Sequence, residues 1–132
     1  MQLAMPAPLR ILVAEDNALI GMLLADMLTA MGHDVCAVAA TESATVASAM
    51  RHRPDLLIAD GWLREGSGIA AVKTILQSHV MAYIFVTGDS AAIRDRMPGA
   101  VILEKPFNEA TLYAAIGAVM HITDPAVQYV SH

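Results

Sequence analysis

The sequence has little cysteine and little positive charge. Cys36 is its one cysteine, so an internal disulfide is excluded. It lies in the apolar run Val35–Ala40, which indicates a buried small side chain rather than a reactive thiol. Eight Lys and Arg residues against thirteen Asp and Glu give a net charge of −5. The nearest basic stretch, Arg51-His52-Arg53, is expected at a helix end, where cations favour the helix dipole. Direct binding to nucleic acid is therefore not expected.

Long apolar runs are also missing, although 56% of the residues are hydrophobic. Runs such as Ala18–Ala25 are far shorter than the ~18–20 residues that a membrane-spanning helix needs. The first residues, Met1–Pro8, lack the basic start and long apolar centre of a signal peptide. We expect one ordinary domain in the cytoplasm, without membrane contact.

Apolar and amphipathic stretches alternate five times, and each pair indicates a strand followed by a helix. The expected strands are Leu9–Ala14, Val35–Ala40, Leu56–Ala59, Tyr83–Val86 and Val101–Leu103. Three helices are expected after the N-caps Asn17, Thr41 and Asn108, and Gly32 and Pro54 end the first two of these. Two more are expected over Ile69–Ser78 and, as only a turn and a half, over Ala91–Arg96.

This order predicts an α/β fold, because parallel strands need helical crossovers. We expect a flavodoxin-like, doubly wound sheet of five parallel strands in the order 2-1-3-4-5, with helices on both faces and a short or missing fourth helix. The domain should span residues 9–122, with tails at 1–8 and 123–132.

Polar residues stand where these strands end, and ligands bind at the carboxyl ends of such sheets. Glu15 and Asp16 follow the expected first strand, and Asp60 follows the third. These two strands should be neighbours in the sheet, which would bring the three carboxylates together. Two unit charges ~4 Å apart repel by ~4 kcal/mol at an effective dielectric of 20, so positive charge must offset them. Lys105, after the fifth strand, supplies one charge, and Mg²⁺ would supply two. The cluster therefore predicts a Mg²⁺ site that is complete only when a phosphoryl group arrives.

The motifs Glu15-Asp16-Asn17, Asp60 with Gly68 eight positions on, Thr87-Gly88 and Lys105-Pro106-Phe107 resemble the signature of response-regulator receiver domains. The resemblance implies that Asp60 accepts a phosphoryl group and that a cis peptide bond precedes Pro106. It implies Mg²⁺ (Mn²⁺ can substitute) bound by Glu15, Asp16, Asp60 and the backbone carbonyl of Trp62, and a phosphoryl group bound by Thr87, Gly88 and Lys105.

Such a domain is not a classical enzyme, but it catalyses its own Mg²⁺-dependent phosphorylation and dephosphorylation. The implied partners are a histidine kinase or histidine phosphotransfer protein as donor, and a downstream protein target. We expect no output domain after Met120, in which case the effect would pass through a partner. The receiver of a hybrid kinase would show the same pattern.

Three features depart from the family pattern. Leu63-Arg64 replace the usual methionine-proline, and glycines at 61, 66 and 68 indicate a pliable loop. Trp62 in this loop is either a surface anchor or a shield that keeps water from the phosphoryl group. Ile102 stands where the family has its switch aromatic, so phosphorylation must be read out by another route.

The short segment before Lys105, with its Thr-Gly and Pro-Gly pairs, resembles a receiver group common in alphaproteobacteria. It points to the last helix and the region Gly88–Gly99 as the contact surface for the target.

Three other functions compete with the receiver. The first is an interaction module with weak or irrelevant phosphorylation: Ile102 leaves it open, and intact Asp60, Thr87 and Lys105 argue against it. A dehalogenase-type hydrolase would have an acid two residues after its nucleophile, where this chain has Trp62. A flavin-binding domain would offer hydroxyls and amides in its first loop, whereas Glu15-Asp16 would repel the flavin phosphate.

Overall fold

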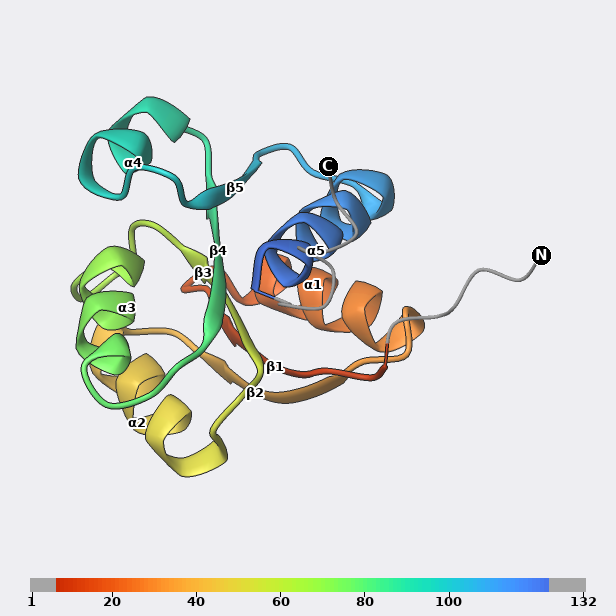
Figure 1. Cartoon of the computed structure of the whole chain (residues 1–132), viewed down its shortest axis with the longest axis horizontal. Coiled ribbons are helices and arrows are strands. Elements are labelled where there is room, and N and C mark those ends of the chain that lie inside the picture. Colours follow the sequence, from red (N-terminus) through yellow and green to blue (C-terminus); the bar gives the residue numbers. More distant parts are fainter. Residues whose placement is uncertain (1–6, 124–132) are drawn as a thin grey trace.

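A computed structural model describes residues 7–123, in which five strands form one parallel sheet (Figure 1). The strands are β1 (Arg10–Ala14), β2 (Asp34–Ala39), β3 (Leu56–Asp60), β4 (Ala82–Thr87) and β5 (Val101–Glu104). Their order is β2-β1-β3-β4-β5, and all four pairings are parallel. The predicted fold class and strand order are confirmed, and β1 and β3 end side by side at the centre of the sheet.

Helices cover both faces of the sheet in this part of the chain. Figure 1 shows α1 (Ala18–Ala30) and α5 (Glu109–Thr123) on one face, and α2 (Glu42–His52) and α3 (Gly68–Leu76) on the other. The short α4 (Ser90–Arg96) reaches the α3 side of the sheet through its buried Ile93.

Each face of the sheet has its own apolar core. Along β1, Ile11 and Val13 pack with residues of α1 and α5, whereas Leu12 and Ala14 pack with residues of α2 and α3. All four are fully buried. A strand buried on both faces explains why the sequence shows continuous apolar runs rather than alternation.

The helix ends agree closely with the expected caps. The side chains of Asn17, Thr41 and Asn108 each accept a hydrogen bond from a backbone N–H in the first turn of their helix. Gly32 follows α1 with a φ of +94°, a conformation that glycine adopts without strain. Both limits of α3 differ from the predicted Ile69–Ser78. The helix begins at Gly68, because Ser67 caps it by accepting from the N–H of Ala70, and it ends at Leu76.

The fourth helix is short, as predicted. It has seven residues, begins after Asp89, whose side chain accepts from the N–H of Ala92, and ends before Gly99 at φ +85°. The predicted tails lie outside the described residues apart from residues 7, 8 and 123. Among the described residues, no helix has the length and apolar character to cross a membrane.

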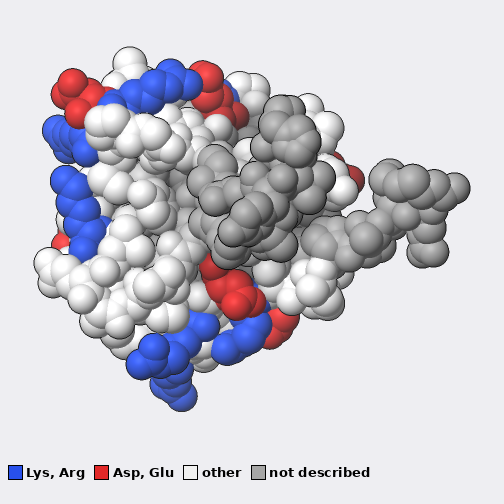
Figure 2. Space-filling model, viewed as in Figure 1, with Lys and Arg blue, Asp and Glu red and all other residues white. Residues whose placement is uncertain are grey.

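The cysteine and the basic stretch lie in structural positions. Cys36 is half-buried rather than fully buried, its Sγ donates to the carbonyl of Ile11 at 3.4 Å, and burial raises the pKa of the thiol. Arg51 and His52 form the last turn of α2, as expected. On the face drawn in Figure 2, basic side chains of the described residues alternate with acidic ones along the margin, without one continuous basic surface.

Candidate functional site

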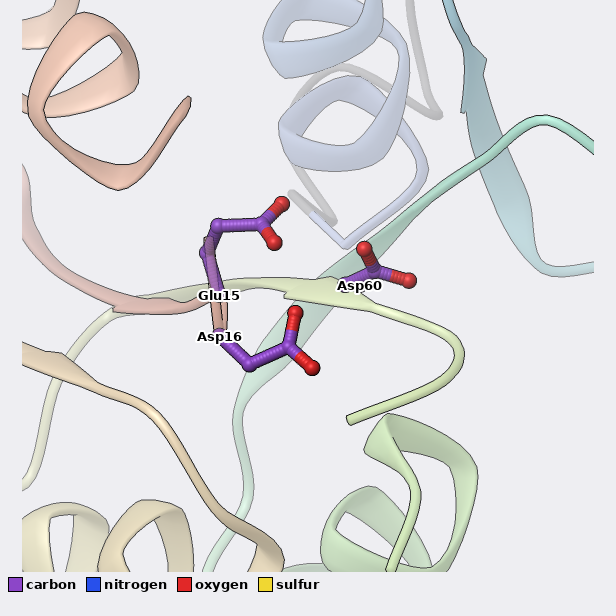
Figure 3. A group of neighbouring side chains, drawn as sticks. All are labelled: Glu15, Asp16 and Asp60. Carbon is purple, nitrogen blue, oxygen red and sulfur yellow. The ribbon is translucent and has the colours of Figure 1, made fainter. Parts of the chain in front are cut away.

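The three acidic residues predicted to converge lie together at the C-terminal ends of β1 and β3. Ala14 pairs with Ala59, so Glu15 and Asp16 leave β1 beside Asp60, the last residue of β3. One carboxylate oxygen of each residue lies within 4.8 Å of the others. Figure 3 shows the three side chains directed toward a common space. The predicted juxtaposition of Asp60 with Asp16 is therefore present in the structure.

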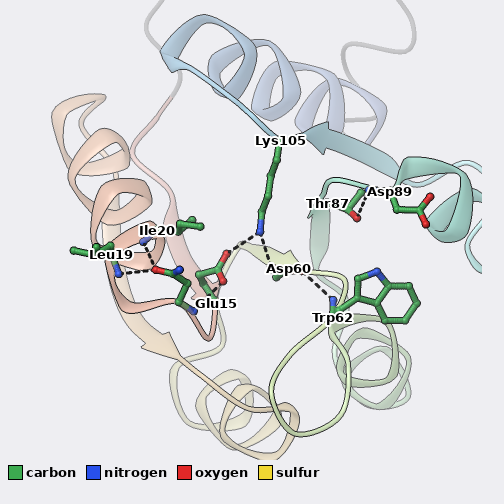
Figure 4. Close-up of polar contacts among 9 residues, drawn as sticks. Glu15, Leu19, Ile20, Asp60, Trp62, Thr87, Asp89 and Lys105 are labelled. Atoms are coloured by element: carbon green, nitrogen blue, oxygen red, sulfur yellow. Dashed lines mark hydrogen bonds and ion pairs between the residues drawn. The ribbon is translucent and has the colours of Figure 1, made fainter.

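Lys105 points into this cluster (Figure 4). Its Nζ donates to Oδ2 of Asp60 at 2.8 Å and lies 3.6 Å from Oε1 of Glu15. The peptide bond between Lys105 and Pro106 is cis, as the resemblance implied. Burial alone would lower the pKa of Lys105, but its hydrogen bond and charge interaction with Asp60, with a further contribution from Glu15, raise it. The ammonium therefore stays charged and offsets part of the repulsion among the carboxylates.

Glu15 is the most deeply buried acid of the cluster, with 3% of its surface exposed. Its Oε2 accepts from the N–H of Asn17 at 3.0 Å. Among the described residues, its Oε1 has no hydrogen-bond partner. Burial raises the pKa of Glu15, the Asn17 N–H acts against this, and the charge of Asp60 adds to it. A buried carboxylate oxygen without a donor is suited to a cation.

The chemistry of the cluster fits a hard divalent cation. Its donors are carboxylate oxygens, which Mg²⁺ prefers, and among the described residues Glu15 Oε1 accepts no hydrogen bond and has only the Lys105 ammonium nearby, at 3.6 Å. Two other acidic residues accept hydrogen bonds from the backbone instead: Asp89 caps α4, and Asp55 accepts from the N–H of Arg10 at the start of β1.

Thr87 ends β4, next to Asp60 in the sheet. Only 1% of its surface is exposed, and its Oγ1 accepts from the N–H of Asp89 at 2.9 Å. Because a hydroxyl group both donates and accepts, Oγ1 can still donate its own proton. The next residue, Gly88, is exposed, and a Cβ there would meet no atom of the described residues within 4 Å.

The loop from Gly61 to Ser67 is held closely on Asp60. The N–H of Trp62 donates to Oδ1 of Asp60 at 3.0 Å, so both oxygens of this carboxylate have donors. Trp62 also forms an antiparallel bridge with Ser67, and the N–H of Gly68 donates to the carbonyl of Gly61 at 3.1 Å. The backbone of Trp62 is therefore at the site, while its ring is 39% exposed.

The glycines of this loop serve close packing rather than the pliability that the sequence indicated. A Cβ on Gly61 would overlap the Ile93 side chain, and a Cβ on Gly68 would overlap the backbone oxygen of Asp60. Gly66 has a φ of +88° and lies against Glu42. Contacts of this kind fix a loop in place.

Two further residues hold the loop: Glu42, which the sequence did not single out, and Arg64, which it marked only as a departure from the family pattern. Glu42, at the start of α2, accepts from the N–H of Ser67 through Oε1 at 3.0 Å and donates its own N–H to the carbonyl of Glu65. Arg64 donates to the backbone oxygen of Asp16 at 3.2 Å, which connects the loop to the acidic cluster. No motif marks Glu42, because its partners lie more than twenty positions away in the sequence.

Comparisons with known proteins agree with this geometry. Residues 11–117 match the model of the response regulator receiver domain family. The chain is 32% identical over 136 residues to the phyllosphere-induced regulator PhyR of Methylorubrum extorquens, covering 99% of this chain and 51% of that protein. It is 36% identical over 113 residues to the transcriptional regulatory protein PdtaR of Mycobacterium tuberculosis, covering 83% and 55%.

Among solved structures, the anti-anti-sigma factor PhyR from Bartonella quintana superposes with a TM-score of 0.81 at 28% identity, covering 93% of this chain and 51% of that one. The chain thus spans about half the length of these relatives.

Proposed function

The chain belongs to the response regulator receiver family, and we propose that its receiver unit, residues 9–122, takes a phosphoryl group onto Asp60 from a phosphohistidine donor in a two-component relay. One observation carries the proposal: the carboxylate of Asp60 lies 2.8 Å from the Lys105 ammonium, within an acidic cluster suited to a divalent cation. A donor protein of this kind would be a histidine kinase or a histidine phosphotransfer protein.

In the proposed reaction, a carboxylate oxygen of Asp60 attacks phosphorus, and the bond from phosphorus to the donor's imidazole nitrogen breaks. The nitrogen leaves with the electron pair, and an aspartyl phosphate forms. Catalysis of this transfer depends on positioning and on neutralising the phosphoryl oxygens. Lys105 and the hydroxyl of Thr87 would contact these oxygens, together with the backbone N–H of Gly88.

Glu15, Asp16, Asp60 and the backbone carbonyl of Trp62 would hold Mg²⁺ or Mn²⁺. The bound cation would neutralise negative charge on the phosphoryl group. With these groups in place, the domain would promote its own phosphorylation and dephosphorylation without being an enzyme that acts on a separate substrate.

The proposal is tested by incubating the protein with acetyl phosphate, with and without Mg²⁺. Mass spectrometry should show one added phosphoryl group on Asp60 in the presence of the metal, and little without it. Absence of labelling under both conditions would favour the alternative, an interaction module that does not depend on phosphorylation.

Replacing Asp16 by asparagine should weaken Mg²⁺ binding by about tenfold or more, which corresponds to about 1.4 kcal/mol, because one of three anionic ligands is lost. Isothermal titration calorimetry measures the change. The matched control is Asp26→Asn, which removes the same charge from an exposed position of α1. Equal Mg²⁺ affinities of the Asp16 variant and the unchanged protein would exclude Asp16 as a ligand.

Thr87→Val should slow labelling by acetyl phosphate by at least about tenfold, because the hydroxyl donor is lost while the shape of this buried side chain is kept. The loss should stay below the ~100–1000-fold typical of removing one oxyanion-hole donor, since Lys105 still acts. Thr87→Ser retains the hydroxyl and should label at nearly the original rate. If both variants label equally slowly, the hydroxyl is not the feature that matters.

The partners of this chain are inferred from the surface around the site. Leu19, Met22 and Leu23 are exposed on α1, which begins two residues after Asp16, and they offer a protein donor an apolar contact beside the acidic cluster. For the downstream target we propose α5 and residues 88–99. Because PhyR of Bartonella quintana is described as an anti-anti-sigma factor, a protein target rather than DNA is favoured.

A further inference from the structure

The side chain at the family's switch position has no means of changing partners here. Ile102 lies on β5, half-buried, and packs against the core shared by α2 and α3. A branched aliphatic side chain has no ring that turns between two sites and no polar atom that exchanges hydrogen bonds. The signal of a modified Asp60 must therefore leave the site through other contacts.

Helix α4 contacts the loop after Asp60 directly at two points. The fully buried Ile93 packs onto the backbone of Gly61, so closely that a Cβ there would overlap it. One turn further on, the guanidinium of Arg96 lies over the ring of Trp62, 5.0 Å from its centroid, which is a cation–π contact. The indole extends on the side of the site where Thr87 and Asp89 lie (Figure 4).

Trp62 connects this helix to the carboxylate itself. Its backbone N–H donates to Oδ1 of Asp60 at 3.0 Å, and its indole ring makes the cation–π contact with Arg96. From these contacts we infer that Trp62 and Arg96 couple the modification state of Asp60 to the C-terminal end of α4. The inference rests on the proposed phosphorylation of Asp60.

Phosphorylation changes the hydrogen bond on which this coupling depends. The carboxylate of Asp60 is an anionic acceptor, and such charge-assisted bonds are the stronger ones. In the acyl phosphate, Oδ1 is either a neutral carbonyl oxygen or the bridging oxygen, and the negative charge resides on the phosphoryl oxygens. The backbone N–H of Trp62 loses its anionic partner in both cases. Trp62 and the guanidinium of Arg96 that lies over its ring therefore shift.

Helix α4 can follow such a shift because it contacts the site at both of its ends. At its N-terminal end, the N–H of Asp89 donates to the hydroxyl oxygen of Thr87. At its C-terminal end, Arg96 contacts the ring of Trp62 in the loop from Gly61 to Ser67. The two ends thus report on different parts of the site. A response at Arg96 and Met97 should depend on Trp62, and a response at Asp89 and Ser90 on Thr87.

The experiment compares backbone amide chemical shifts with and without Mg²⁺ and beryllofluoride, a phosphoryl analogue. In the unchanged protein, the amides of Arg96 and Met97 should move. In Arg96→Gln this movement should fall to less than half at residue 97, while the shifts of Asp89 and Ser90 and the labelling of Asp60 by acetyl phosphate stay as before. Arg94→Gln, which removes the same charge from an exposed position of the same helix, should keep the movement at residues 96 and 97 of the unchanged protein; because Arg94 donates to the Ser90 hydroxyl, only these two amides are compared in this control.

A second variant, Trp62→Leu, removes the indole ring and keeps the backbone N–H. At saturating beryllofluoride it should reduce the shift changes of Arg96 and Met97 as much as Arg96→Gln reduces that of residue 97. Wild-type shifts at residues 96 and 97 in this variant would overturn the inference. So would a labelled protein whose α4 C-terminal amides do not move. A protein that is not labelled at Asp60 at all would instead overturn the proposed function, and the inference with it.

Discussion

Replacing Asp60 by asparagine is expected to reduce acetyl phosphate labelling to the background of the assay. An amide nitrogen has no free lone pair with which to attack phosphorus, and the amide oxygen is a far weaker nucleophile than a carboxylate oxygen. Glu15 does not replace it readily, because Glu15 is 3% exposed and hydrogen-bonded to Asn17. The loss of labelling is measured by mass spectrometry after incubation with Mg²⁺ and acetyl phosphate.

The same substitution should leave the fold intact. It removes one negative charge from a crowded acidic cluster, and Lys105 keeps Glu15 as a neighbour at 3.6 Å. We expect the melting temperature to change by less than about 4 °C, equivalent to about 1 kcal/mol. Asp95→Asn, at an exposed position of α4, is the matched control and should label normally. Full labelling of the Asp60 variant would mean that the acceptor is another residue.

Gly68→Ala should have the largest effect on stability. Gly68 is the first residue of α3, and its added Cβ would overlap the backbone oxygen of Asp60 and lie 3.1 Å from the carbonyl carbon and 3.2 Å from Cβ of Ala59. Backbone atoms of a central strand cannot rotate away as a flexible side chain can. Either α3 or the end of β3 must move, so we expect a loss of about 3 kcal/mol and a decrease in melting temperature of roughly 10 °C.

Labelling of the Gly68 variant should also decrease, because the displaced atoms belong to Asp60. The control is Gly117→Ala on α5, where a Cβ would meet no atom of the described residues within 4 Å. There the methyl group should stabilise the helix by up to about 1 kcal/mol. Thermal unfolding followed by circular dichroism distinguishes the two. A Gly68 variant as stable as the Gly117 variant would show that α3 packs less tightly on β3 than the structure indicates.

The sequence was sufficient to predict the fold and the centre of the site. Five strand–helix pairs determine a parallel sheet, and the order β2-β1-β3-β4-β5 brings Asp16, Asp60 and Lys105 together at its carboxyl edge. The short α4 was also predictable, because the helix must fit between the turn at Gly88 and the stop at Pro98-Gly99. These features depend on local patterns and on general rules of sheet topology.

The contacts that hold the loop from Gly61 to Ser67 could not be predicted. Glu42, Arg64 and Arg96 are ordinary surface residue types, and their roles depend on tertiary distances that no local pattern contains. Glycine was ambiguous for a related reason. A glycine in a sequence shows that a side chain is absent, but Gly61 and Gly68 need that absence for space, whereas Gly66 also needs it for a positive φ.

The bond between Glu42 and Ser67 has a consequence for protein engineering. Residues 61–67 are contiguous in the sequence, which suggests a cassette that could be exchanged between homologous proteins. Yet Glu42 Oε1 accepts from Ser67, and Gly66 leaves the space that the Glu42 side chain occupies. A chimera that imports the loop must therefore import Glu42 from the preceding helix as well. Otherwise the transplanted segment lacks one of its anchors. Conversely, Glu42 introduced without the loop would overlap any residue bulkier than glycine at position 66.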